Sequence, residues 1–287
     1  MSAEAELARL EGQVLGIARV SRFLDAVDEL RRMLARESPE IRRRVLALVA
    51  PSIGKDLAAA VGAAWNIGIA DATSIADEGK AKGIDGKPPT PLVLAARAAE
   101  RTIADEMKKA RKLASAGADD MTVLAPVFAA ANGLKRDVVT LVNAAGNAGA
   151  TAVADAAGLA TVWVAETNAC VECLAYSGRV AKPGKSFPGG LTYGAKSYNP
   201  EPIAYPPRHP RCRCTVEPLR APEYAEALRR EADRSVLRGF SLESESMKTR
   251  IDAADRLVSR GVDAPKSVIA YARRAVKVGE FPARGRP

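Results

Sequence analysis

The arrangement of cysteine and histidine constrains the fold of this chain more than any other feature of its sequence. All four cysteines and the only histidine lie between positions 170 and 214, as Cys170-Val-Glu-Cys173, 35 further residues, and His209-Pro-Arg-Cys212-Arg-Cys214. The two sulfurs of a C-x-x-C turn can reach one ion, and a pair from a distant segment completes a tetrahedron. The spacing therefore predicts one closed metal site, and its soft or borderline ligands favour a single structural zinc ion.

Five side chains compete for the four positions of this predicted zinc site. Cys170 and Cys173 form the first pair, and His209 and Cys212 repeat its spacing. Cys212 and Cys214 would lie on the same side of a strand, so either of them can supply the fourth ligand. The preferred set is Cys170, Cys173, His209 and Cys212, with Cys214 as the second choice.

A bound metal would also explain how the surrounding region is ordered. Residues 182–210 are dense in glycine, proline, serine and tyrosine, and the stretch is too long for an ordinary connection. It has little apolar content, so we expect something other than a hydrophobic core to hold it together.

Other interpretations of the cysteines are less favoured. A disulfide framework is unusual in a reducing cytoplasm, and free core cysteines beside a hydrogen-bonded histidine form a second alternative. A Cys–His nucleophile pair lacks an acidic or amide residue placed to orient the histidine. The H-x-E element of zinc deaminases is absent because Pro210 and Arg211 follow His209. The H-E-x-x-H helix of metalloproteases needs a second histidine, so a closed, non-catalytic site is favoured.

The first 160 residues are typical of helices packed through small side chains. Aromatic residues make up only 5% of the chain, and its apolar content is mostly alanine, leucine and valine, which favours helices over a β-sandwich. One-face apolar stripes predict helices over 52–77, with Ser52 as N-cap, and over 91–114. A further alanine-rich helix is expected over 138–157, ending at Gly158.

The character of the sequence changes at residue 161. Strands are predicted at 161–165, 179–180 and 212–216, and helices return at 222–237, 241–260 and 265–278. These last helices are short and strongly charged, so we expect them to dock on a partner or on the rest of the chain. The predicted fold is mainly α, with an alanine-rich helical body (1–160), a small α+β zinc-stapled domain with short strands (161–220) and a helical C-terminal extension (221–287).

The positive charge of the chain is concentrated in its second half. The net charge is +9, and residues 161–220 and 221–287 each contribute an excess of four basic side chains. Such an excess can face nucleic acid or an acidic protein surface, and a solvated basic face is an equally good interpretation. The alternative function is therefore a zinc-containing nucleic-acid-binding module, in which knuckles present basic groups and tyrosines stack on bases. Its candidate residues are Lys182, Lys185, Lys196, Arg208, Arg211, Arg213, Tyr193, Tyr198 and Tyr205.

Neither a membrane segment nor a secretion signal is indicated. The first residues carry three glutamates and no apolar core, unlike a signal peptide, and the uncharged runs are too short or too polar to span a bilayer. We expect a soluble protein made in a reducing cytoplasm.

One further pattern runs through the region 140–218. It consists of Trp163 in a predicted strand, Cys170 to Cys173, the turn Ser177-Gly178 and the run Pro206 to Cys214. This pattern resembles the phage Mu F-like minor head protein family, the phage head morphogenesis proteins, whose hallmark is a tryptophan strand, a C-x-x-C, a glycine turn and a terminal P-x-H-P-x-C-R-C. The match covers about a quarter of the chain, and the last 67 residues lie outside the hallmark.

The resemblance implies a non-catalytic minor capsid protein. It would be a low-copy component inside the phage head near the portal, assembled in the host cytoplasm and acting in head assembly or genome delivery. Its partners would be the portal, scaffold or major capsid protein, with packaged DNA as a further candidate, and without a membrane or small-molecule substrate. The family's domain also occurs fused to toxin effectors, so a toxin-like effector enzyme is a second alternative. The short helices that follow the hallmark here carry no effector active-site pattern.

Overall fold

The computed structural model describes residues 3–76, 84, 86–166, 169–192, 199–238, 247–259 and 266–280. Within them the chain is mainly helical with one small three-stranded antiparallel sheet, which confirms the predicted fold class. The chain divides into two compact units. The first comprises Met1–Gly68 and Asp85–Gly146, and the second comprises Ile69–Ile84 and Asn147–Pro287. The three-part division at residues 160 and 220 stays a prediction.

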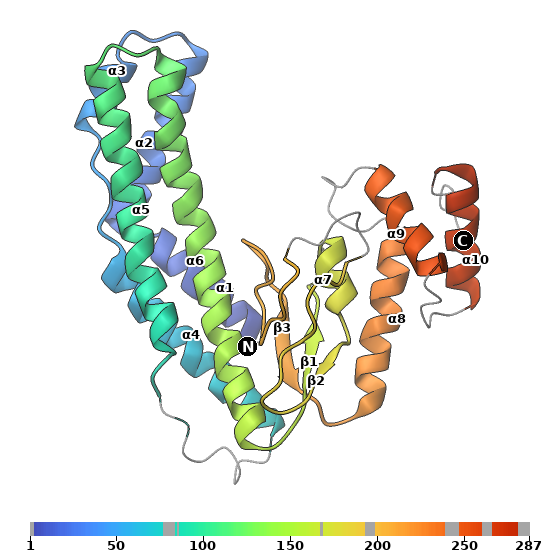
Figure 1. Ribbon diagram of the computed structural model, residues 1–287. Coiled ribbons are helices and arrows are strands. Elements are labelled where there is room, and N and C mark those ends of the chain that lie inside the picture. The colour runs from blue at the N-terminus through green and yellow to red at the C-terminus, as the bar shows by residue number, and fades with distance from the viewer. Residues whose placement is uncertain are drawn as a thin grey trace. The chain divides into compact units, whose positions relative to one another are not determined.

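The first unit is a bundle of helices around one core (Figure 1). It contains α1 (Ala3–Leu15), α2 (Ala18–Ala35), α3 (Ile41–Ala47), α5 (Thr90–Ser115) and the greater parts of α4 (Gly54–Ile75) and α6 (Asp120–Ala156). The predicted stripe of α5 is buried at Ala96, Ala99, Ile103 and Met107. Alanine at such positions lets helices approach closely, so a large core forms with few aromatic side chains.

Two predicted helix ends had different outcomes. The helix expected over 138–157 begins earlier than predicted, since α6 starts at Asp120. Its end agrees with the prediction, because α6 ends at Ala156 and Gly158 has the left-handed φ of +65° that glycine tolerates. The predicted N-cap Ser52 is wrong, since α4 begins at Gly54. Glu100 of α5 accepts hydrogen bonds from the Gly54 N–H and the Ser52 hydroxyl, so a distant carboxylate takes the role that Ser52 was expected to fill.

The second unit contains the sheet, in the order β2-β1-β3. Strand β1 (Thr161–Val164) pairs antiparallel with β2 (Val180–Ala181) and with β3 (Thr215–Pro218), and in the second pair Trp163 lies opposite Val216. The strand predicted at 212–216 starts later than expected. Cys212 instead closes a turn, in which its N–H donates to the carbonyl of His209 at 3.1 Å.

An aromatic cluster forms the core of the second unit. Trp163, Tyr176 and Phe187 are fully buried, and the rings of Tyr176 and Phe187 lie 4.9 and 5.4 Å from that of Trp163. Phe187 also exchanges backbone hydrogen bonds with Ile203. Residues 182–210 were expected to be held together by something other than a hydrophobic core, but Phe187 in this stretch belongs to the core of the second unit.

Helix α8 (Pro222–Arg238) packs on this unit beside α7 (Val171–Tyr176). The hydroxyl of Ser177 donates to the Leu228 carbonyl at 3.4 Å, and Ala232 belongs to the unit's core. Helices α9 (Met247–Ser259) and α10 (Lys266–Val278) contact each other and α8. The predicted helix at 241–260 is described only from Met247, since 239–246 lie outside the described residues.

Candidate metal centre

The predicted ligands come from two segments of the second unit. Cys170 precedes the first residue of α7 and Cys173 lies in its first turn, while His209, Cys212 and Cys214 belong to the segment that leads into β3. The Nε2 atom of His209 is 3.1 Å from the sulfur of Cys170 and 3.1 Å from that of Cys173. The sulfur of Cys173 is also 3.5 Å from that of Cys212. The structure thus brings the two halves of the sequence pattern together.

The donor atoms form two overlapping groups that could hold a metal ion. One comprises Cys170, Cys173 and His209, the other comprises Cys173, Cys212 and Cys214, and within each group the donor atoms lie within 4.8 Å of one another. Cys173 belongs to both groups. Either Cys212 or Cys214 can therefore join the first three donors, and both remain candidates for the fourth ligand.

The spacing and burial of the donors fit a tetrahedral ion. Zinc with Zn–S of ~2.3 Å and Zn–N of ~2.0 Å separates its sulfurs by about 3.8 Å and a sulfur from a nitrogen by about 3.5 Å. The observed separations of 3.1 to 3.5 Å are shorter by less than about half an ångström. Cys173, Cys212 and Cys214 are buried, whereas Cys170 and His209 are partly exposed. Among the described residues, these cysteines form no disulfide.

The thiols shift one another's pKa values in opposite directions. Hydrogen bonding to Cys173 is the main reason that the pKa of Cys170 falls to about 4, and it also holds the pKa of Cys212 well below its usual range. Neighbouring thiols raise the pKa of Cys173. For Cys214 the hydrogen bond with Cys173 lowers the pKa, but the bond with Cys212 and burial outweigh that effect. The cluster thus favours two thiolates, and the thiolate is the form that binds metals.

The imidazole of His209 responds to these thiolates. Burial disfavours its charged form, but the hydrogen bond with Cys170 and the negative charges of Cys170 and Cys212 raise the pKa of His209 to about 9. Without a metal, a positive charge on this ring balances part of the negative charge of the sulfurs. A bound cation would supply that balance instead and leave the ring nitrogen free to coordinate.

A buried ion pair joins the two ligand-bearing segments. Glu172 lies between Cys170 and Cys173 in the sequence, and Arg208 immediately precedes His209. The guanidinium Nε of Arg208 donates to Glu172 at 3.1 Å, its Nη1 donates to the Glu201 carbonyl at 2.6 Å, and its charge lies over the Tyr176 ring at 5.0 Å. The pair therefore holds the cysteine turn against the histidine turn through side chains that are not ligands.

Asn147 fixes the second segment from another direction. Its side-chain amide donates to the Cys214 carbonyl at 3.1 Å and accepts from the Val216 N–H at 2.7 Å. These paired hydrogen bonds tie the start of β3 to the last part of α6. Sequence reasoning missed Asn147 and the Glu172–Arg208 pair, because neither spacing nor composition says which polar residues meet when the chain folds.

The residues predicted to contact nucleic acid have different outcomes. Arg208 is wrong as a surface contact, because only 3% of it is exposed and its charge is paired with Glu172. Lys182, Lys185, Arg211 and Arg213 are exposed. Burial raises the pKa of Tyr205, which packs against the aromatic core. Tyr193, Lys196 and Tyr198 lie outside the described residues.

No family model, curated protein or solved structure matches this chain. In the part of the chain that the structure describes, no helix has both the length and the apolar content needed to cross a membrane. The geometry of the Cys/His cluster and the resemblance of its sequence to a known hallmark are therefore the basis for a functional proposal.

Proposed function

We propose that this chain is a non-catalytic structural protein of a bacteriophage head, in which one zinc ion staples the second unit. One observation supports this most strongly: the separate parts of the phage Mu F-like hallmark meet around one centre. Trp163 is buried in the core that also contains Cys173, the C-x-x-C spans the start of α7, and His209 lies 3.1 Å from both of its sulfurs. A motif whose parts are far apart in sequence but adjacent in the fold is what a structural metal site requires.

The donor chemistry supports zinc over other metals. Thiolates and an imidazole in a small buried site suit zinc, whereas calcium, magnesium and manganese prefer oxygen ligands. Cys170, Cys173 and His209 would hold the ion together with Cys212 or Cys214. Four protein ligands leave no open position for water or substrate, so the ion would cross-link two segments and supply no catalytic chemistry.

Metal analysis tests the zinc site directly. Native mass spectrometry of protein purified without chelator should show one zinc ion per chain. Cys212→Ser and Cys214→Ser form a matched pair, in which the variant of the true fourth ligand should lose zinc affinity by at least tenfold more than the other. Metal-free protein with four reactive thiols would overturn the zinc proposal.

The proposed place of the protein is inside the phage head, in low copy near the portal, with portal, scaffold or major capsid protein as partner. The resemblance of residues 140–218 supports this, and assembly would take place in the host cytoplasm. Co-expression with the portal, scaffold and major capsid proteins encoded beside its gene should give heads that contain a few copies of the chain, counted by quantitative mass spectrometry. Heads that exclude the chain would overturn this role.

Exposed basic groups of the second unit favour a second candidate, a nucleic-acid-binding module. Lys182, Lys185, Arg211 and Arg213 are exposed, and packaged DNA would be their partner. Because counterion release governs such binding, retention on DNA should weaken steeply with salt. Exchanging Arg211 and Arg213 for glutamate should abolish retention if this candidate is correct.

A further inference from the structure

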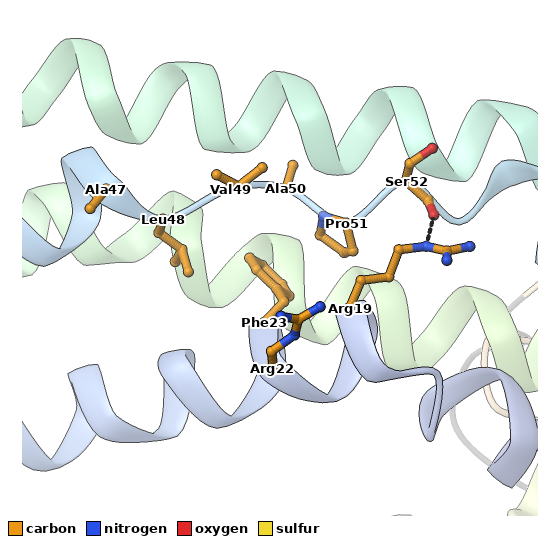
Figure 2. Close-up of a pocket in the computed structure, with 9 residues that line it drawn as sticks. All are labelled: Arg19, Arg22, Phe23, Ala47, Leu48, Val49, Ala50, Pro51 and Ser52. Atoms are coloured by element: carbon orange, nitrogen blue, oxygen red, sulfur yellow. Dashed lines mark hydrogen bonds between the residues drawn. The ribbon is translucent and has the colours of Figure 1, made fainter.

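A groove in the first unit lies beside a segment that is neither helix nor strand. Residues 48–53 connect α3 to α4 in an extended path, and residues 48–52 border a cavity of about 460 Å³. Phe23, Arg19 and Arg22 of α2 form the opposite wall, and Leu48 and Pro51 point toward that wall (Figure 2). The Cys/His centre contributes no residue to this groove.

The extended segment is held at both ends and left unpaired between them. Arg111 of α5 donates to the Leu48 carbonyl at 2.8 Å, and Arg19 donates through Nε to the Ser52 carbonyl at 2.5 Å (Figure 2). The backbone groups of Val49 and Ala50 form no hydrogen bond with any other described residue. A fixed, extended backbone with free N–H and C=O groups resembles the edge of a sheet and can pair with another strand.

The side chains around the groove define which strand would fit. Phe23, which is 2% exposed, forms the apolar floor of the groove, and Val49 on the connecting segment is 73% exposed. Arg19 is already paired with Asp56. Arg22 is exposed, donates through Nε to the Ala18 carbonyl and forms no ion pair with a described residue, so its charge is available to an incoming carboxylate.

We propose that this groove binds an extended peptide segment of a partner protein, which adds as a strand along Val49 and Ala50. Main-chain hydrogen bonds would supply affinity, as in other cases of strand addition. An apolar or β-branched side chain of the peptide would fill the space over Phe23, and an aspartate or glutamate would pair with Arg22. The occupant is thus an acidic, β-prone segment, and the charge of Arg22 disfavours a basic segment.

A defined peptide library tests the proposal on the full-length chain. Octapeptides of random sequence, synthesised with blocked ends, are selected on immobilised protein, and the best binder is labelled for fluorescence anisotropy. We expect enrichment of peptides that combine an acidic residue with β-branched neighbours. Arg22→Glu should weaken their binding at least tenfold, whereas Arg22→Lys should retain most of it. Arg230→Glu, which makes the same charge change on α8, should have no effect.

A second variant separates strand addition from simple attraction between charges. Ala50→Pro removes an N–H from the unpaired edge without changing any charge, and it should weaken peptide binding. In the wild-type protein, free acetate at constant ionic strength should not displace the bound peptide. Enrichment of basic peptides, an absence of enrichment, or equal binding by wild type and Arg22→Glu would each overturn the proposal. Displacement of the peptide by millimolar acetate would instead identify a simple anion site and overturn it as well.

Discussion

At the scale of single residues, the Glu172–Arg208 pair connects the two segments that carry the candidate metal ligands. Both side chains are almost fully buried, so each charge depends on the other for compensation. A buried pair of this kind costs much when broken and less when both charges are removed.

A double-mutant cycle should show that removing one charge of the pair costs more stability than removing both. Arg208→Met leaves the Glu172 carboxylate buried without its cation and should lower the free energy of unfolding by about 3–5 kcal/mol. The double variant Glu172→Gln with Arg208→Met should recover part of this loss, measured by urea denaturation of the metal-loaded protein. If the two single effects simply add, the pair does not act as a unit and this account of the site fails.

Glu217 on β3 should make stability depend on pH. Burial and the nearby charge of Asp71 raise the pKa of Glu217 above 4.5, although a hydrogen bond from Tyr224 opposes the shift. The folded state therefore keeps the Glu217 proton to higher pH than the unfolded state, and stability falls as pH rises through the folded pKa. Glu217→Gln should thus raise the Tm relative to wild type more at pH 7 than at pH 4.

Glu217→Gln should also change the pKa of Tyr224. Burial, the charge of Glu217 and the hydrogen bond to it raise the pKa of Tyr224 to about 12. Replacing the carboxylate by a neutral amide should lower that pKa in an ultraviolet titration. A difference in Tm between the two proteins that stays constant from pH 4 to pH 7 would contradict the assignment.

At the scale of elements, the contact between α7 and α8 depends on one glycine. Gly178 has a φ of +70°, and its N–H donates to the Trp163 carbonyl at 2.8 Å. A Cβ at this position would lie 2.2 Å from the Ala225 carbonyl oxygen and 2.8 Å from the Arg229 nitrogen of α8. Both are backbone atoms, so the helix could not make room by changing a rotamer.

The variants Gly178→Ala and Gly158→Ala form a matched pair. Comparing them separates the strain of a positive φ from the clash of a Cβ with α8. Gly158 also has a positive φ, but a Cβ there would meet no atom within 4 Å, so alanine should cost only the backbone strain of about 1–2 kcal/mol. Gly178→Ala should cost about 1–3 kcal/mol more through overpacking and should make α8 sensitive to protease. Equal loss of stability in both variants would show that α8 does not pack against this turn.

The sequence predicted an element well where its ends are set by residues close to them in the chain, and poorly where they are set by distant residues. Both ends of α5 and α8, the C-terminal end of α6 and the position of β1 follow from prolines, glycines and apolar periodicity, and they were predicted closely. The start of α6, which lies at Asp120 and not at 138, was not predicted closely. The start of α4 was not, because the carboxylate of Glu100 lies 46 residues from Gly54 in the chain. The burial of Arg208 was missed for the same reason. The clustering of the cysteines and His209 was predicted because a metal site needs particular residue types at particular spacings.

At the scale of the whole molecule, the two compact units have different sources of stability. The first has a large helical core built mainly from alanine, valine and leucine, and it contains none of the predicted ligands. The second has a smaller core in which Cys173, Cys212 and Cys214 pack with the aromatic cluster. A metal bound at the cysteines would therefore contribute to the free energy of unfolding of the second unit alone.

Metal removal should accordingly produce two separate unfolding transitions. Because structural zinc contributes many kcal/mol to small domains, chelation should lower the Tm of the second unit by at least about 10 °C. Helicity from the first unit should survive to the original temperature. Hydrogen exchange followed by mass spectrometry should show lost protection in 169–192 and 199–218, with α2 and α5 unchanged.

Cys173→Ser should reproduce this pattern and make the protein insensitive to chelator, since Cys173 belongs to both donor groups. Equal loss of protection in α2 and α5 would mean that the units do not unfold independently.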